Sequence, residues 1–279
     1  MAAAAPPPDV RNAPYGPHER NVLDVWLPRS GGPAPLVIFI HGGGFYGGDK
    51  TGYRPVILTE CLDAGMAFAA VNYRLTDVAG YPAQMLDAAR AVQTLRHRAA
   101  EWHLDPNRFG ATGGSAGAGI SMWLGFHEDL ADPGSDDPVA RQSTRLSALA
   151  VYGAQCTYDP RDVAEIAGFP HDTTHPALEK LFRLPEGWTF ESITRDRELH
   201  DRIRDAAAIT HLSAGDPPVF AIYSRKAAVP EEVHHPNFGK VLKARMDELA
   251  IECLLRYWED YPGADDADRD MAAFLIERV

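Results

Sequence analysis

The sequence predicts an α/β fold, with a mostly parallel central sheet of about eight strands and helices on both faces. Three observations support this prediction. The chain has 279 residues, 45% of them apolar, which is enough for one large core. Short apolar runs typical of buried strands alternate with segments of helical periodicity. A serine between glycines follows one of these runs directly, as at a sharp strand-to-helix turn.

Seven apolar runs have the length and composition of buried strands, and they cover residues 21–27, 35–41, 66–73, 108–112, 146–153, 218–224 and 252–258. Between most of them lie stretches with apolar residues at helical spacing, the clearest being 81–102, 237–250 and 268–279. This alternation of strand and helix favours a parallel sheet that is covered on both faces.

We expect residues 1–20 to form a disordered tail and residues 21–279 to form one domain. Two inserts interrupt the alternation of strands and helices. Residues 127–144 are polar and rich in turn residues, whereas residues 156–213 hold aromatic residues and two or three short helical patterns. Long loops at the carboxyl ends of strands often carry substrate contacts, so we expect these inserts to form a small cap.

Charge and cysteine content exclude several classes of partner. The chain has 27 basic and 39 acidic residues, a formal net charge of -12, which repels nucleic acid and anionic lipid. Cys61, Cys156 and Cys253 are widely separated, so neither a disulfide framework nor a zinc knuckle is indicated. The first residues, MAAAAPPPDV, lack the features of a secretory signal, and no run is long enough to span a membrane. We expect a cytoplasmic protein.

The segment GGSAG places Ser115 among small residues directly after the apolar run 108–112. The pattern G-x-S-x-G is typical of a turn that presents a nucleophilic serine at the start of a helix. The alternative is a glycine-rich loop without chemistry.

A second glycine-rich segment, HGGGFYGGDK, follows the apolar run 35–41. Glycines there allow backbone N–H groups to point into one cavity, as a developing oxyanion requires. A phosphate loop is the alternative, but the segment lacks both the G-K-[ST] ending and the G-x-G-x-x-G spacing of nucleotide sites.

These two segments, together with VNYRL at 71–75 and LDPNRFGATGGSAGAG at 104–119, resemble the α/β-hydrolase superfamily. The similarity is to the hormone-sensitive-lipase-like esterases and to the related branch that includes feruloyl-esterase-like and kynurenine-formamidase-like proteins. It covers residues 20–279. The resemblance implies that Ser115 is the nucleophile. It assigns the oxyanion hole to the N–H groups of Gly43, Gly44 and Ala116. His41 stands at the strand end before the glycines, where it suits a hydrogen bond that braces the loop, so we expect it to be structural.

The usual partners of the serine are missing from their expected positions. The superfamily supplies them in the order serine, acid, histidine. In the loop after the last predicted strand, Asp266 stands where related sequences have histidine. After the strand 218–224, Ala227 and Ala228 stand where an aspartate is expected. Either the partners have moved or the chain is no longer a hydrolase.

The candidates for a relocated base are His234 and His235, in the loop that normally carries the acid. We favour His235, because Pro236 suits the first position of a helix, whose partial positive charge keeps a nearby imidazole neutral. Asp266 is one carboxylate that could orient the base. The other carboxylates are Glu231, Glu232, Asp260 and Asp159. Alternatively, both histidines only pack at a helix start.

No cofactor or metal ion is expected from the sequence. His171 and His175 have the spacing of metal ligands, but prolines enclose them and no third ligand is evident. His127 and His200 also lie in or beside the inserts, where they could contact substrate.

The sequence therefore predicts a serine carboxylesterase that hydrolyses small short-acyl or aromatic esters through an acyl-enzyme on Ser115. The alternative is a catalytically degenerate α/β-hydrolase that acts as a small-molecule binding protein or receptor. The expected partner is a small ester, and neither nucleic acid nor a membrane.

Overall fold

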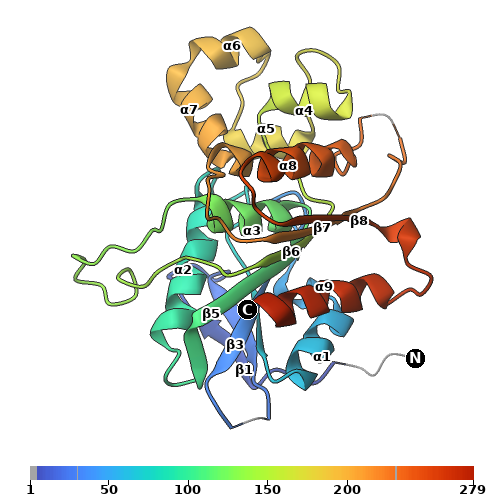
Figure 1. Ribbon diagram of the computed structural model, residues 1–279. Helices are drawn as coiled ribbons and strands as arrows, with labels where there is room; N and C mark the ends of the chain where they lie inside the picture. The colour runs from blue at the N-terminus through green and yellow to red at the C-terminus, as the bar shows by residue number, and fades with distance from the viewer. Residues whose placement is uncertain (1–4, 30, 230) are drawn as a thin grey trace.

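The computed structural model describes residues 5–29, 31–229 and 231–279, and in this part of the chain one eight-stranded sheet crosses the molecule (Figure 1). The strands lie in the order β1-β2-β4-β3-β5-β6-β7-β8. Pairing is antiparallel between β1 and β2 and between β2 and β4, and parallel elsewhere. The strands are β1 (Val10–Pro14), β2 (Val22–Trp26), β3 (Ala34–Ile40), β4 (Ala67–Val71), β5 (Leu104–Gly114), β6 (Leu149–Tyr152), β7 (Val219–Tyr223) and β8 (Cys253–Tyr257).

Helices cover both faces of the sheet. Two of them, α1 (Pro55–Asp63) and α9 (Asp266–Arg278), pack together on one face, and α2 (Ala83–His97), α3 (Ala116–Phe126) and α8 (Asn237–Glu248) cover the other (Figure 1). Side chains of β3 alternate between two apolar clusters, with Ile38 toward α2 and α3 and Phe39 toward α1. Burial on both faces is why the central strands read as continuous apolar runs.

The expected disordered tail is wrong for residues 10–14, which form the edge strand β1. Asn12 donates its backbone N–H to Asp24 Oδ1 at 2.7 Å, and Ala13 stands opposite Leu23 in β2. The segment VRNAP is mostly exposed, so it lacks the apolar run that revealed the other strands. Residues 1–4 lie outside the described part of the chain.

Only the second insert forms a cap. It folds into α4 (Pro160–Ala167), α5 (Pro176–Phe182), α6 (Phe190–Arg195) and α7 (Arg197–Ala206), which lie together at the top of Figure 1, with α4 packed against α8. The first insert, 127–144, packs along α2 instead. Gln93 of α2 donates its side-chain N–H groups to the backbone oxygens of Leu130, Ala140 and Gln142. The expectation that both inserts contribute to the cap is therefore wrong for residues 127–144.

Three short 3-10 helices complete the described elements: η1 (Lys50–Gly52), η2 (Ala208–Thr210) and η3 (Trp258–Asp260). No helix in the described ranges combines the length and the apolar composition that a membrane span requires.

Candidate active site

Ser115 lies at the sharp turn between β5 and α3. Its backbone has φ 52° and ψ -123°, a conformation that costs energy for any residue with a Cβ atom. Its N–H is bonded to the backbone oxygen of Tyr152 in β6, and its carbonyl accepts from Gly119 in α3. The turn is therefore held at both ends, and the serine side chain faces the carboxyl edge of the sheet.

Glycines surround Ser115 because backbones approach each other closely there. A Cβ atom on Gly117 would lie 2.0 Å from the backbone oxygen of Ile40, and one on Gly113 would lie 2.5 Å from the same oxygen. A Cβ on Gly42 would lie 2.7 Å from the backbone oxygen of Gly114. The segment is a packed strand-to-helix turn beside the end of β3, and the interpretation as a plain glycine-rich loop does not account for this packing.

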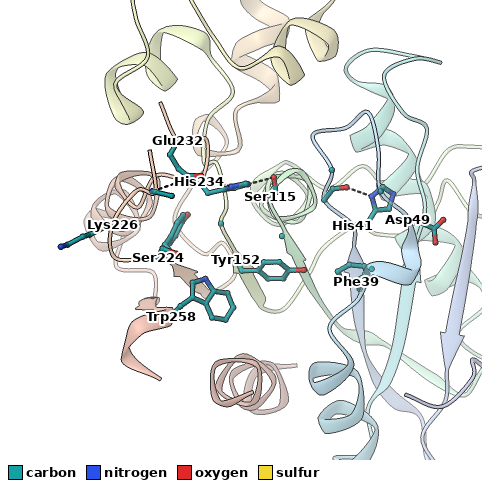
Figure 2. A pocket seen from close by; sticks show the side chains of 18 residues that line it. Phe39, His41, Asp49, Ser115, Tyr152, Ser224, Lys226, Glu232, His234 and Trp258 are labelled. Atoms are coloured by element: carbon teal, nitrogen blue, oxygen red, sulfur yellow. Dashed lines mark hydrogen bonds and ion pairs between the residues drawn. The ribbon is translucent and has the colours of Figure 1, made fainter. Parts of the chain in front are cut away.

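His234 reaches Ser115 from the loop after β7 (Figure 2). Its Nε2 lies 2.9 Å from the Ser115 Oγ, within hydrogen-bond distance. On the other side of the ring, Glu232 Oε1 lies 3.6 Å from Nδ1, and the second oxygen of this carboxylate accepts from the backbone N–H of Ala228 at 2.9 Å. The carboxylate favours the tautomer with its proton on Nδ1, which leaves Nε2 free to accept the serine proton.

Two residues after β6 position His234, and neither was predicted from the sequence. Gly153 has φ +55°, and a Cβ atom there would lie 3.2 Å from Cδ2 of the His234 ring. Gln155 is buried and donates its side-chain N–H groups to the backbone oxygens of Gly153 and Val233, at 3.0 and 2.6 Å. The available signal was the polar side chain in YGAQC, directly after a buried strand.

His235, the base predicted from the sequence, has a different contact. Its Nδ1 accepts from the backbone N–H of Asn237 at 3.1 Å and so satisfies one of the free N–H groups at the start of α8. The preference for His235 over His234 is therefore wrong as a matter of geometry. Consecutive residues in this turn point in different directions, and the one nearer α8 caps the helix.

Asp266 does not face the histidine. It lies at the start of α9, where it accepts from the backbone N–H of Gly263 at 2.9 Å and pairs with Arg269 at 3.2 Å. Two of the other suggested carboxylates also have arginine partners, since Asp260 pairs with Arg225 and Asp159 with Arg161. Among the five carboxylates considered, Glu232 is the one placed beside His234.

The glycines after β3 line the space around Ser115. Gly43 and Gly44 have φ of +103° and +59°, which only glycine adopts readily. Gly43 and Ser115 line one cavity, and Gly44, Ala116 and Ser115 line another. Ala116 is the first residue of α3, where helix N–H groups have no partner within the helix. The three expected oxyanion-hole residues therefore all line cavities that Ser115 also lines.

His41 contacts the backbone of this glycine loop. Its Nδ1 lies 2.7 Å from the Gly42 backbone oxygen, and its ring stacks on Tyr73 with centroids 4.2 Å apart. Burial lowers the pKa of His41 to about 4, and the Arg20 guanidinium, 3.1 Å from Nε2, acts in the same direction. His41 is therefore neutral near pH 7 and accepts a hydrogen bond from Arg20, in keeping with a structural role.

Two cavities meet at Ser115. The larger, of about 490 Å³, is bordered by Phe39, Tyr152 and Trp258 and by Lys226 (Figure 2). The smaller, of about 40 Å³, lies on the cap side, and its apolar lining comes from α4, α5, α8 and neighbouring loops. Its apolar lining residues include Phe45, Tyr158, Val163, Leu178, Val233 and Phe238.

The histidines with metal-ligand spacing have separate partners. His171 is exposed and pairs with Asp172, whereas the Nδ1 of His175 accepts from the Ala177 backbone N–H at the start of α5. His175 also lines the smaller cavity, and burial lowers its pKa.

Comparison with known proteins shows the family of the chain. The sequence model of the BD-FAE family matches residues 23–232. The chain is 27% identical to the probable carboxylic ester hydrolase LipM of Mycobacterium tuberculosis over 216 residues, 76% of this chain and 46% of LipM. It is 25% identical to the esterase LipQ of the same organism over 236 residues, 82% of this chain and 52% of LipQ. The chain thus spans about half the length of these curated relatives.

Solved structures show the same fold. A truncated form of a carbohydrate esterase from gut microbiota superposes with a TM-score of 0.74 at 21% identity, covering 96% of this chain and 94% of that protein. The eight-stranded, mostly parallel sheet and its two helix layers therefore have the α/β-hydrolase fold.

Proposed function

Since the chain belongs to the BD-FAE family, we propose that it is a serine carboxylesterase that hydrolyses small esters through an acyl-enzyme on Ser115. The observation that carries the proposal is the 2.9 Å separation between the Ser115 Oγ and His234 Nε2. The named relatives LipM and LipQ, an ester hydrolase and an esterase, support the same class of reaction.

The geometry suits the two half-reactions of ester hydrolysis. Ser115 Oγ attacks the ester carbonyl carbon while His234 Nε2 takes the hydroxyl proton. The carbonyl oxygen becomes an oxyanion that accepts from backbone N–H groups of the glycine loop and of Ala116. The carbon–oxygen bond to the alcohol then breaks, and His234 returns the proton to the leaving alkoxide. Water attacks the acyl-enzyme with the same base and releases the carboxylic acid and Ser115.

Glu232 has an auxiliary role in this mechanism. Its carboxylate lies 3.6 Å from Nδ1, so it stabilises the imidazolium that forms while Nε2 holds the proton. At this distance the contact is an ion pair and not a short hydrogen bond. Gln155 and Gly153 hold the ring in place without touching the reacting atoms.

We assign the two cavities to the two halves of the substrate. A volume of about 40 Å³ fits only about three heavy atoms at roughly 10–15 Å³ each, so the smaller cavity would take the alkyl part of an acetyl or propionyl group, whose carbonyl lies at Ser115. The larger cavity is open and bordered by the aromatic rings of Phe39, Tyr152 and Trp258, which suits an aromatic alcohol group. The substrate class is therefore short-acyl esters, including those of aromatic alcohols. We also propose a cytoplasmic location, on the wide spacing of the three cysteines alone.

A series of p-nitrophenyl esters tests the proposal. We expect kcat/KM to be highest for the acetate or propionate and to fall at least about tenfold for the octanoate, because a longer chain cannot enter the smaller cavity. A fluorophosphonate probe should label wild type on Ser115 and leave Ser115→Ala unlabelled. A folded wild type that neither hydrolyses these esters nor reacts with the probe would contradict esterase function and favour the binding-protein alternative.

A further inference from the structure

Three potential metal ligands meet where the cap joins the central helix α3. His127 directly follows α3, Asp205 lies in the last turn of α7, and His211 follows η2. One ligand atom from each residue lies within 4.8 Å of the other two. His127 and His211 are partly buried, whereas the Asp205 side chain is 48% exposed. We propose that His127, Asp205 and His211 form a binding site for a divalent transition-metal ion of the zinc type.

The donor set determines the class of ion. Two imidazole nitrogens and one carboxylate oxygen suit zinc and neighbouring transition metals, whereas calcium and magnesium prefer oxygen ligands alone. Zinc bonds to histidine and carboxylate of about 2.0–2.1 Å place the ligand atoms about 3.3 Å apart in a tetrahedron. The Asp205 Oδ1 and His211 Nε2 are 3.6 Å apart, close to that separation. The remaining separations between ligand atoms are at most 4.8 Å, and side-chain rotations of His127 and His211 would shorten them to the zinc value. Water would complete the coordination.

Neighbouring groups already orient two of the three ligands. The Tyr81 hydroxyl donates to Asp205 Oδ2, which leaves Oδ1 as the free carboxylate oxygen. His127 Nδ1 lies 2.9 Å from the backbone oxygen of Glu128, and a donated bond there leaves the lone pair on Nε2. Such hydrogen bonds from the far side of a ligand are typical of metal sites, because they fix the tautomer and the orientation of the ring.

Trp123 connects the cluster to α3. Its ring lies 4.2 Å from the His127 ring, and its Nε1 donates to the backbone oxygen of Asp205 at 2.8 Å. The His127 and His211 rings are 4.6 Å apart, so the two histidines face each other across the junction. Eleven residues of α3 separate this site from Ser115, about 16 Å at 1.5 Å per residue. A bound ion would therefore tie the cap to the core and take no part in ester hydrolysis.

Without an ion, the same groups form a hydrogen-bonded cluster, since His211 Nε2 lies 2.7 Å from the backbone oxygen of Asp205. A zinc titration of the metal-stripped full chain distinguishes the two possibilities. We expect isothermal titration calorimetry to give one equivalent of bound Zn²⁺, and the Tm to rise with zinc because the ion binds the folded chain. No binding of Zn²⁺, or binding that leaves the Tm unchanged, would overturn the proposal.

Variants locate the bound ion. His127→Gln and His211→Gln should each weaken zinc binding at least about tenfold, and Tyr81→Phe about tenfold, on the scale of losing a group that orients a ligand. The matched control is His200→Gln, which removes an α7 histidine that also lies beside an aspartate and should keep wild-type affinity. Unchanged affinity in a folded His127→Gln/His211→Gln double variant would overturn the site.

A measurement on wild type keeps the test decisive if the variants fail to fold. Cobalt(II) in place of zinc should give the strong visible absorption of a four-coordinate ion with nitrogen and oxygen ligands. A weak spectrum typical of six-coordinate, water-bound cobalt would contradict a built site. Because every readout is binding, Tm or a spectrum, failure of this proposal is distinguishable from failure of the proposed esterase function.

Discussion

Replacing Glu232 with glutamine tests whether the carboxylate beside His234 assists catalysis. Glutamine has the same shape and keeps an oxygen acceptor for the Ala228 N–H, so the change removes mainly the negative charge. Two unit charges 3.6 Å apart interact by about 1 kcal/mol in bulk water and by about 4–5 kcal/mol at an effective dielectric constant of 20.

The exposure of the pair decides where in this range the effect falls. The side chains of His234 and Glu232 are 43% and 22% exposed, so solvent screens much of the attraction. We therefore expect Glu232→Gln to destabilise the imidazolium transition state by about 1–2 kcal/mol, which lowers kcat/KM about 5- to 30-fold. The loss should shrink at high salt, because a partly exposed ion pair is screened by ions.

The assay is hydrolysis of p-nitrophenyl acetate at two salt concentrations, with Glu231→Gln as the matched control. Glu231 is exposed and adjacent in sequence, so its variant changes the net charge equally without touching the pair. Equal kcat/KM in wild type and Glu232→Gln would refute the orienting role. A loss as large as that of His234→Ala would refute the argument from screening.

Four further predictions follow from the site. Ser115→Ala should abolish fluorophosphonate labelling and lower the esterase rate at least about 10³-fold, as judged by active-site titration and kcat. His234→Ala should lower kcat/KM at least about 10²-fold, whereas His235→Ala should instead cost about 1 kcal/mol of stability in urea unfolding through the lost helix cap; the reverse ranking would exclude this assignment. Gly153→Val should lower kcat at least about tenfold without unfolding the chain, because its side chain displaces the His234 ring, and unchanged kcat would count against that packing. His41 takes up a proton below pH 6.5 in the unfolded chain but only near pH 4 in the folded chain. Lowering the pH from 7.5 to 5 should therefore reduce the free energy of unfolding, measured in urea, by about 2 kcal/mol through this residue, and this contribution should be absent in His41→Gln.

The strands were predictable because the sheet is buried on both faces. Each of the seven predicted runs overlaps an observed strand, since nearly every side chain of a central strand must be apolar. The edge strand Val10–Pro14 lacks this constraint, because its stability comes from backbone pairing with β2 that leaves no apolar pattern. The helix Pro55–Asp63 was not assigned either, since nine residues give too few turns for a clear periodicity.

The site was predictable where chemistry requires a fixed backbone and uncertain where it requires a side-chain direction. The glycines around Ser115 are required by contacts between backbones, so they appear in the sequence as a spaced motif. The choice between His234 and His235 depends on how a turn rotates two successive residues. That rotation is set by contacts with Gly153 and Gln155, which are distant in sequence, and no local pattern encodes it.

The loop after β8 explains how the base could move to the loop after β7. In the usual α/β-hydrolase order the histidine follows the acid, yet here the β8 loop carries carboxylates and supports its neighbour instead. Glu259 in η3 accepts from the backbone N–H of Arg225 through both oxygens, at 3.0 and 2.9 Å, where the β7 loop begins. Gln155 holds the backbone of the same loop at Val233, near its other end. A loop fixed at both ends has less conformational freedom to lose when His234 takes up its position beside the serine hydroxyl, so a general base can be presented from this loop at a smaller entropic cost.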